Sequence, residues 1–206
     1  IIMLTKKGTE IREYKGYTIE IWPDEDVENP REDGYFLGKM VCFHKRYALG
    51  DQHHSSPEDF QEFVRREKPV VILPLYLYDH SVLSISTKSF IGRAQHAEWD
   101  SGQVGWAYIS KEDALKEYEV KRISKKIRAE LRAVLESEVE VYDQFLQGEV
   151  YGFTIRDAGG NEVESVGGYF GDPGKYLMDE VRRIVDNRGA YALPYEGKET
   201  YEDMGW

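Results

Sequence analysis

The sequence predicts an α+β fold in a single domain, with a largely antiparallel sheet packed by one long helix and two or three shorter helices. Strand-like and helix-like segments follow one another without the regular alternation of a parallel α/β sheet. The longest helical segment, after Ser124, carries an apolar stripe that needs a core to cover. No linker rich in Pro, Gly or Ser divides the 206 residues. We therefore expect one domain over residues 1–206, with residues 1–13 and 194–206 loosely held.

Strand and helix signals begin early in the chain. Residues 17–22 alternate as a half-buried strand, and residues 39–47 indicate a second strand. A helix should begin at Ser56, because Ser is a good N-cap and Pro57 suits the first helical position. Asp59, three residues after the cap, completes the pattern of a capping box.

The next segment predicts the central strand of the sheet. Residues 69–78 form a nearly continuous run of aliphatic and aromatic residues, typical of a strand covered on both faces. Pro74 predicts an edge, a bulge or a break in it, since proline cannot donate to the ladder. Further strands are expected at residues 82–87 and 104–109, and the capping pattern that starts at Ser110 predicts a short helix.

The longest predicted helix begins after Ser124 and stops near Gly148, a residue suited to the end of a helix. Apolar residues recur along it at helical spacing. They are Ile127, Leu131, Val134, Leu135, Tyr142, Phe145 and Leu146.

The last third of the chain predicts a hairpin followed by a helix. Strand-like residues 149–156 and 162–170 flank the turn sequence Asp-Ala-Gly-Gly-Asn at 157–161. Glycines readily supply the positive φ that such turns need. Apolar residues between 177 and 185 predict a final helix that stops near Gly189.

The composition is that of an ordered globular protein. Hydrophobic residues make up 41%, charged residues 32% and aromatic residues 13% of the chain. No apolar run approaches the ~18 residues of a membrane span, so we expect no membrane segment. The single Cys42 excludes an intrachain disulfide and fits a reducing interior, which favours the cytoplasm of a host cell. Its strand-like neighbours favour a small core residue over a nucleophile.

The net charge of −11 argues against nucleic acid as a direct general ligand, because such binders neutralise phosphates with Lys and Arg. The charge is uneven: a basic run spans residues 121–132, and an acidic run precedes residue 34. The acidic run consists of Asp24, Glu25, Asp26, Glu28, Glu32 and Asp33. Such runs are often solvated surface. The alternative is a negative surface that binds a host protein whose normal ligand is DNA or RNA.

Two polar segments follow strand-like runs and are the best candidates for a site. Together they contain Asp79, His80, Asp100, Ser101 and Gln103. Short polar side chains of this kind often bond the backbone of a turn, and residues 99–103 resemble a tight turn. The same residue types could supply a base, its orienting carboxylate and hydrogen-bonding groups to a ligand. Adjacent strand residues point to opposite faces, so a catalytic set would have to combine both segments.

A metal site is a further hypothesis. His44, Asp51 and His53 offer imidazole and carboxylate ligands of the kind that zinc prefers. Their spacing matches no closed zinc motif, and neighbouring histidines in a loop are common by chance. No cofactor can be assigned from the sequence.

Several long motifs carry a resemblance to a known family. They lie at residues 16–21, 40–51, 71–81 (VILPLYLYDHS), 99–105 (WDSGQVG), 121–126 and 140–153. In these motifs the chain resembles an uncharacterised protein family of bacteriophages, prophages and conjugative elements. Residues 92–98 look like an extended insert relative to that family. The resemblance implies a mobile-element setting and no particular activity.

Three functions follow from these observations. The first is a phage or mobile-element accessory protein that binds a host protein through its acidic surface, in an anti-defence role. The second is a small hydrolase or nucleotide-binding enzyme built on the two polar segments. The third is a virion component that assembles with itself. The sequence leaves the partner and the oligomeric state open.

Overall fold

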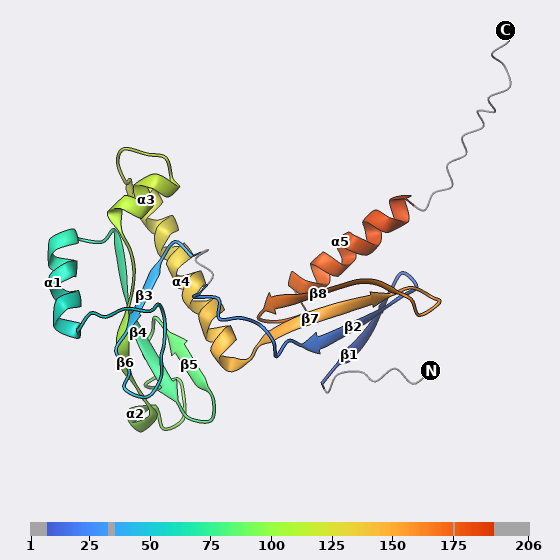
Figure 1. Cartoon of the computed structure of the whole chain (residues 1–206), viewed down its shortest axis with the longest axis horizontal. Helices are drawn as coiled ribbons and strands as arrows, with labels where there is room; N and C mark the ends of the chain where they lie inside the picture. Colours follow the sequence, from blue (N-terminus) through green and yellow to red (C-terminus); the bar gives the residue numbers. More distant parts are fainter. Residues whose placement is uncertain (1–7, 33–35, 175, 192–206) are drawn as a thin grey trace, which may run out of the picture. The chain divides into compact units, whose positions relative to one another are not determined.

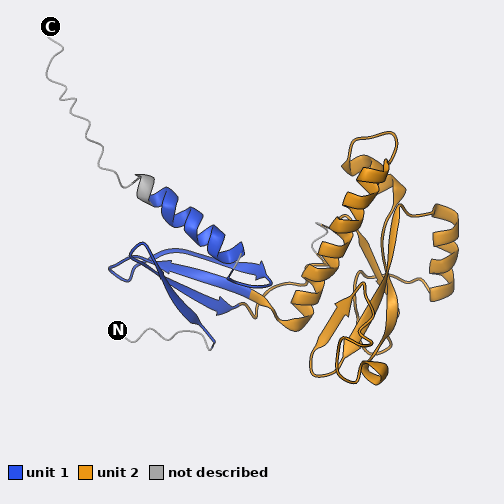
Figure 2. Cartoon of the chain, turned by 180° about the vertical axis from the view of Figure 1, so that it is seen from behind, with its two compact units in different colours: residues 1–23, 151–206 blue, residues 24–150 orange. Residues whose placement is uncertain are grey.

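The computed structural model describes residues 8–32, 36–174 and 176–191, which form helices and two antiparallel sheets (Figure 1). The predicted α+β class is confirmed. The sequence was interpreted as one domain, whereas the contacts divide the chain into two compact units (Figure 2). Unit 1 contains residues 1–23 and 151–206, and unit 2 contains residues 24–150. Each unit has its own sheet and core and is described by itself.

Unit 1 is a four-stranded sheet with one helix. The strand order is β1 (Glu10–Tyr14), β2 (Tyr17–Pro23), β7 (Val150–Arg156) and β8 (Glu162–Phe170). Helix α5 (Tyr176–Tyr191) follows β8 and packs on one face of this sheet. The core holds alternate residues of β2 and β7 and the apolar stripe of α5. Its buried members are Ile19, Ile21, Phe153, Ile155, Leu177, Met178, Val181 and Val185.

The predicted hairpin joins β7 to β8. The Asp157 carboxylate accepts hydrogen bonds from the backbone N–H groups of Gly159 and Asn161, both at 2.9 Å. Gly160 adopts a φ of +80°, a left-handed conformation that glycine adopts without steric cost. The turn is therefore fixed by an Asx-type side-chain bond together with a permissive glycine.

The prediction that residues 1–13 are loosely held is wrong for residues 10–13, which belong to β1. Glu10 pairs with Ile21 and Tyr14 with Tyr17, in register along β2. The sequence pattern does not predict β1, because this edge strand is rich in charged residues and its apolar residue Ile11 is 59% exposed. Residues 1–7 and the tail from Pro194 lie outside the described ranges.

Unit 2 contains the second sheet. Its strand order is β3 (Lys39–Cys42), β6 (Ser101–Ile109), β4 (Val71–Asp79) and β5 (Leu83–Ser86), and all neighbours are antiparallel. The central strand β4 has a register shift between Leu75 and Tyr76, next to Pro74. The bulge predicted from Pro74 is thus present. The pairing with β5 covers only Tyr76 to Asp79, so Pro74 has no neighbour on that side.

Two predicted elements of unit 2 differ from the observed ones. The turn expected at residues 99–103 is instead the short helix α2 (Ala97–Asp100) followed directly by β6. The strand expected over residues 39–47 ends at Cys42. Its continuation turns because the His44 side chain accepts hydrogen bonds from the backbone N–H groups of Arg46 and Tyr47.

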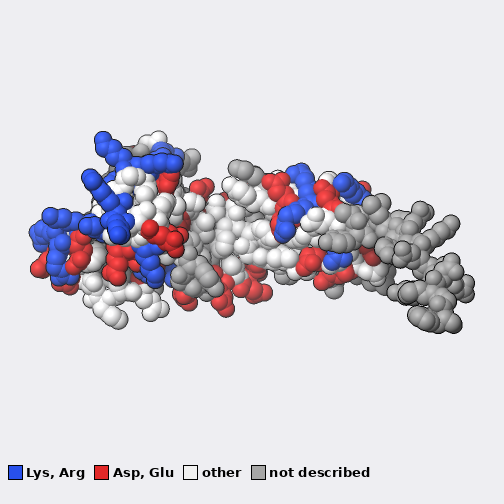
Figure 3. Space-filling view, turned by 90° about the horizontal axis from the view of Figure 1, so that it is seen from above, with Lys and Arg blue, Asp and Glu red and all other residues white. Residues whose placement is uncertain are grey.

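Three further helices of unit 2 are α1 (Pro57–Glu67), α3 (Lys111–Glu117) and α4 (Lys125–Gln147). The serine before each helix accepts a hydrogen bond from the third helical N–H group, as the sequence predicts. Lys and Arg gather over the end of unit 2 that holds α3 and the start of α4 (Figure 3). None of the helices in the described ranges is both long and apolar enough to cross a membrane.

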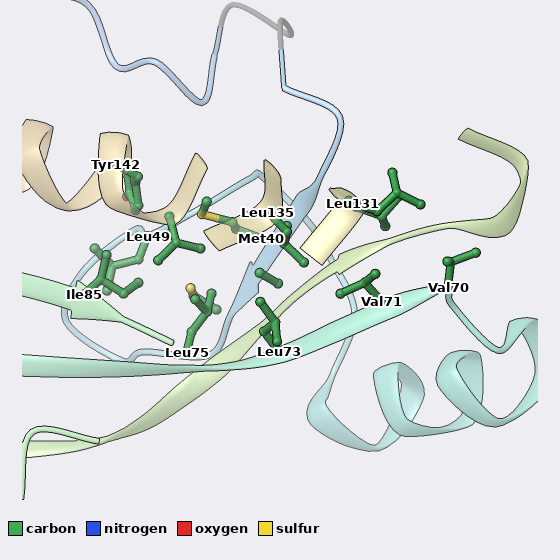
Figure 4. Packing of buried hydrophobic residues seen from close by; sticks show 14 of the residues in the cluster. Met40, Leu49, Val70, Val71, Leu73, Leu75, Ile85, Leu131, Leu135 and Tyr142 are labelled. Carbon is green, nitrogen blue, oxygen red and sulfur yellow. The ribbon is translucent and has the colours of Figure 1, made fainter. Parts of the chain in front are cut away.

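Helix α4 covers one face of the unit 2 sheet. Leu131, Leu135 and Tyr142 point from the helix toward Leu73 and Leu75 of β4 (Figure 4), and all five side chains are buried. Every second residue of β4 faces this layer, which explains its strongly apolar sequence. One predicted member of the stripe, Val134, is 37% exposed and lies at the margin of the helix face.

A buried polar network lies between α4 and the segment before β3. The Glu138 carboxylate accepts hydrogen bonds from the backbone N–H groups of Leu37 (2.7 Å) and Gly38 (2.8 Å). Arg31, whose side chain is 2% exposed, forms two hydrogen bonds to Asp51 and one to the Gly38 carbonyl oxygen. A Cβ atom at Gly38 would lie 2.2 Å from Leu135 Cδ1 and 2.5 Å from Glu138 Oε2, so a larger residue would displace these two buried side chains.

We predict that Glu138→Ala lowers the free energy of unfolding by about 2–3 kcal/mol. The substitution leaves the buried Gly38 N–H group and the part-buried Leu37 N–H group without an acceptor, and it opens a space beside α4. Urea denaturation monitored by circular dichroism measures the change in unfolding free energy. The matched control is Glu140→Ala on the exposed side of the same helix, which should stay within about 0.5 kcal/mol of the parent. Equal stabilities of the two variants would contradict this role of Glu138.

The same carboxyl predicts a pH dependence. Burial raises the pKa of Glu138, and its two backbone hydrogen bonds only partly oppose this. The folded chain then holds the proton more tightly than the unfolded chain. The stability from this group is therefore present below the unfolded pKa of about 4.3 and is lost as pH rises through the folded pKa.

We therefore expect the unfolding free energy of the parent, relative to that of Glu138→Gln, to fall as the pH rises above about 4. Urea titrations at a series of pH values measure this difference. The corresponding difference for Glu140→Gln provides the baseline. A parent-to-variant difference that rises with pH would show that the sign of the shift is wrong.

Candidate functional site

The two polar segments predicted from the sequence meet at one end of the unit 2 sheet. Strand β4 ends at Asp79 and β6 begins at Ser101, and Tyr78 pairs with Ser101 across the ladder. The residues just after β4 therefore lie beside those just before β6. As a result, His80 Nδ1 and Asp100 Oδ2 are 2.9 Å apart.

This contact fixes the orientation of the imidazole ring. An ionised carboxylate can only accept hydrogen bonds, so the proton lies on His80 Nδ1. In the neutral ring Nε2 is then unprotonated and can accept a proton. The His80 side chain is 46% exposed and the Asp100 side chain 31%, so the pair is open to ligands. The arrangement is that of a general base with an orienting carboxylate.

The other three predicted residues do not join this pair. Asp79 forms an ion pair with Arg46 and accepts a hydrogen bond from the Tyr47 hydroxyl group at 3.2 Å. Ser101 Oγ donates to the Ala97 carbonyl oxygen at 2.6 Å, and Gln103 Nε2 donates to the Gly105 carbonyl oxygen at 3.3 Å. Strand alternation and local backbone bonds thus reduce the five-residue candidate to His80 and Asp100.

A hollow of about 450 Å³ lies beside His80 and includes residues that sequence reasoning missed. The rings of Phe90 and Tyr78 are stacked with centroids 5.4 Å apart, and those of Tyr78 and His80 are stacked at 5.8 Å. Ser81, Ser84 and Gln147 also line the hollow. The alternation of β4 places Tyr78 and His80 on one side of the strand, but nothing in the sequence connects Phe90 with them.

Arg93 supplies a positive charge to the same hollow. Its guanidinium group lies 5.1 Å from the centre of the Phe90 ring. Nε donates to the Ser89 carbonyl oxygen and Nη2 to that of Lys88, both at 2.7 Å. Within the described residues no hydrogen bond is formed by Nη1, so this group can receive an anion. Planar rings, hydroxyl groups, an oriented base and a held cation suit a ligand with an aromatic ring and an anionic group.

The hypothesised metal ligands are engaged separately. His44 Nδ1 accepts two backbone hydrogen bonds, Asp51 binds Arg31, and His53 Nε2 donates to the Cys42 carbonyl oxygen at 2.8 Å. Across the described ranges, no three His, Cys, Asp or Glu side chains are grouped so as to hold a metal ion. His44, Asp51 and His53 are close together in the sequence, but the structure does not group them as the ligands of one metal ion.

Cys42 lies in the core of unit 2. Burial raises the pKa of its thiol to about 12, which removes the thiolate that nucleophilic catalysis needs. The sequence-based preference for a core residue agrees with this position.

The acidic run forms a surface on unit 2, except for Asp33, which lies outside the described residues. Asp24 N donates to the Val150 carbonyl oxygen, which fixes the start of the run. Four of its carboxylates are exposed and form no ion pair with any described residue. They are Glu25, Asp26, Glu28 and Glu32, and we name them the acidic surface. Arg31, the cation within the run, is buried against Asp51 and does not neutralise this surface.

Comparison of the chain with known protein families, with curated proteins and with solved structures finds no match.

Proposed function

We propose that this protein is a small hydrolase that acts on a nucleotide or a similar anionic aromatic ligand. The observation that carries the proposal is the 2.9 Å contact between His80 Nδ1 and Asp100, which leaves Nε2 as a base on a side chain that is 46% exposed. The hollow beside His80 offers stacking surfaces for a planar group, and Arg93 offers a charge for an anionic group.

The chemistry requires no side-chain nucleophile. Ser101 is unsuited to that role, because its hydroxyl group is bonded to the Ala97 carbonyl oxygen. A water molecule can instead attack the ester, with His80 Nε2 taking its proton and Asp100 stabilising the imidazolium ion that forms. The same proton can then pass to the leaving oxygen. Arg93 would hold the anionic group and offset the charge that develops during attack.

We predict that His80→Gln lowers hydrolysis by about 100-fold or more, because a positioned general base typically contributes 10²–10⁴-fold. Asp100→Asn should lower kcat with a smaller change in KM, since the ligand does not need that carboxylate for binding. Initial rates should be measured with a panel of nucleoside mono-, di- and triphosphates and with p-nitrophenyl phosphate.

His54→Gln is the matched control, because His54 is an exposed loop histidine of the same unit. It should leave the rates unchanged. Hydrolysis of no panel member by the parent, or equal rates in the parent and His80→Gln, would overturn the proposal.

Binding of a host protein through the acidic surface is the second candidate function. The observation that favours it is the burial of Arg31, which leaves four exposed carboxylates with no cation among them. Unopposed charge of one sign steers association and selects partners of opposite sign. The resemblance to proteins of phages and conjugative elements supports an accessory role in a host cell, with a host nucleic-acid-binding protein as the partner.

We expect charge reversal of Glu25, Asp26 and Glu28 to lysine to abolish binding to basic nucleic-acid-binding proteins. Binding can be measured by biolayer interferometry against a panel of purified bacterial histone-like and restriction proteins. The control reverses Glu58, Glu62 and Glu67, three exposed acids on α1, with the same change in charge. A similar loss in both triple variants would reduce the effect to net charge and exclude a defined surface.

A further inference from the structure

A second charged surface of unit 2 has the opposite sign. Four cations lie within six residues, in the loop before α4 and in its first turn, and all four are exposed. They are Lys121, Arg122, Lys125 and Lys126, and we name them the basic surface. Lys126 lies 3.8 Å from Glu130, and the other three form no ion pair with any described residue. Figure 3 shows Lys and Arg gathered at this end of the unit.

Lys125 and Lys126 lie at a position where positive charge does not stabilise α4. The amino-terminal end of a helix carries a partial positive charge, so cations there are unfavourable by a few tenths of a kcal/mol each. The first turn of α4 contains no acid, and the Ile127 N–H group donates the N-cap hydrogen bond to Ser124 Oγ. Stability of α4 therefore does not explain Lys125 and Lys126.

We propose that the basic surface binds the phosphate backbone of a nucleic acid, without reading its bases. Exposed cations gain little from discrete carboxylates, since a surface ion pair contributes about 0–1 kcal/mol. Binding to a nucleic acid strand gains more free energy than binding to single carboxylates, because each neutralised phosphate releases a condensed counterion and so increases the entropy. A cluster of four exposed cations therefore gains more from a polyphosphate than from a folded acidic protein.

The net charge of −11 does not prevent this binding. Asp24, the start of the acidic run, is bonded to Val150, just beyond the carboxyl-terminal end of α4. The 23 residues of α4 separate that point from Lys125 by roughly 34 Å. The other end of the acidic run lies closer: Arg31, next to Glu32, donates to the Gly38 carbonyl oxygen, and the Gly38 N–H group donates to Glu138, which is 13 residues or roughly 20 Å along α4 from Lys125. Screening reduces the interaction of exposed charges beyond about 8 Å at physiological salt. The acidic and basic surfaces consequently act on their surroundings independently.

The acids nearest the basic surface do not cancel it. Asp113 accepts a hydrogen bond at 2.7 Å from the hydroxyl group of Ser110, the N-cap residue of α3. Glu130 lies 3.8 Å from Lys126. Glu117 and Glu119 are exposed on the preceding helix and loop, and they limit the favourable potential to the segment from Lys121 onward. We therefore expect moderate affinity and strong dependence on salt.

The experiment uses the full chain and fluorescence anisotropy with short labelled DNA strands, DNA duplexes and RNA at about 50 mM salt and above. Binding should be similar for unrelated base sequences. The slope of log K against log salt should be about −3 to −4 for four contacts on a duplex. Absence of binding to all three nucleic acids at low salt would overturn the proposal.

The test variant is Lys125→Glu/Lys126→Glu, and its control is Arg182→Glu/Arg183→Glu, which reverses two consecutive exposed cations on α5. The test variant should bind at least tenfold more weakly and lower the salt slope by about 2, while the control keeps its affinity. Acids in the first turn favour the helix and offset the loss of the Lys126–Glu130 pair, so the melting temperature of the test variant should change little.

Two outcomes would overturn the assignment of nucleic-acid binding to the basic surface. Equal weakening in both variants would indicate a general charge effect. Concentration-dependent scattering of the parent that the test variant abolishes, without any binding to nucleic acid, would instead show contact with the acidic surface of a second copy. Either result rejects the nucleic-acid proposal and leaves the proposed hydrolase function untouched, because His80 is not altered.

Discussion

The arrangement of unit 2 depends on one buried guanidinium group. Arg31 bonds to Asp51 and to the Gly38 carbonyl oxygen, and Asp51 in turn accepts the N–H group of Met40 at the start of β3. Removing one partner from a buried ion pair typically costs about 3–5 kcal/mol, since the other charge remains without compensation. This contact therefore joins the segment before β3 to the segment after it.

Glu138 extends the same network from the other side. Its carboxylate accepts the two N–H groups at residues 37 and 38, which attaches the segment to α4. One guanidinium group faces two carboxylates in this region, and burial raises the pKa of Glu138. This network also affects the surface. Arg31 is buried and residues 36–38 are held on α4, so the exposed acids Glu25, Asp26, Glu28 and Glu32 have no ion-pair partner among the described residues.

The sequence anticipated the elements whose signals are local. Ser56, Ser110 and Ser124 cap helices because an N-cap depends only on the next three residues. The division into two units was not anticipated. Periodicity shows that one face of a strand is buried, but it does not show which layer covers it. The β2 and β7 residues meet α5, whereas the β4 residues meet α4, and both patterns look alike in sequence.

The candidate site shows the same limit at the level of side chains. His80 and Asp100 could be connected because each lies where a strand begins or ends. Asp79 is adjacent to His80 but pairs with Arg46 instead, because successive residues along a strand face opposite sides. Phe90 and Arg93 could not be foreseen, because their place beside Tyr78 depends on the path of a loop. Local sequence patterns thus predict the His80–Asp100 pair, whereas the hollow beside it depends on tertiary packing.

The basic surface and the His80–Asp100 pair of unit 2 are separated by the length of its central strand. Arg128, in the second turn of α4, donates to the Val70 carbonyl oxygen just before β4 begins, and His80 follows directly after β4 ends. Nine strand residues extend roughly 30 Å, so the basic surface and the His80–Asp100 pair lie at opposite ends of β4. Substitutions that far apart, with no shared partner, act additively on stability. Any coupling between nucleic-acid binding and hydrolysis would then have to come from one ligand long enough to reach both ends, and not from strain passed through the sheet.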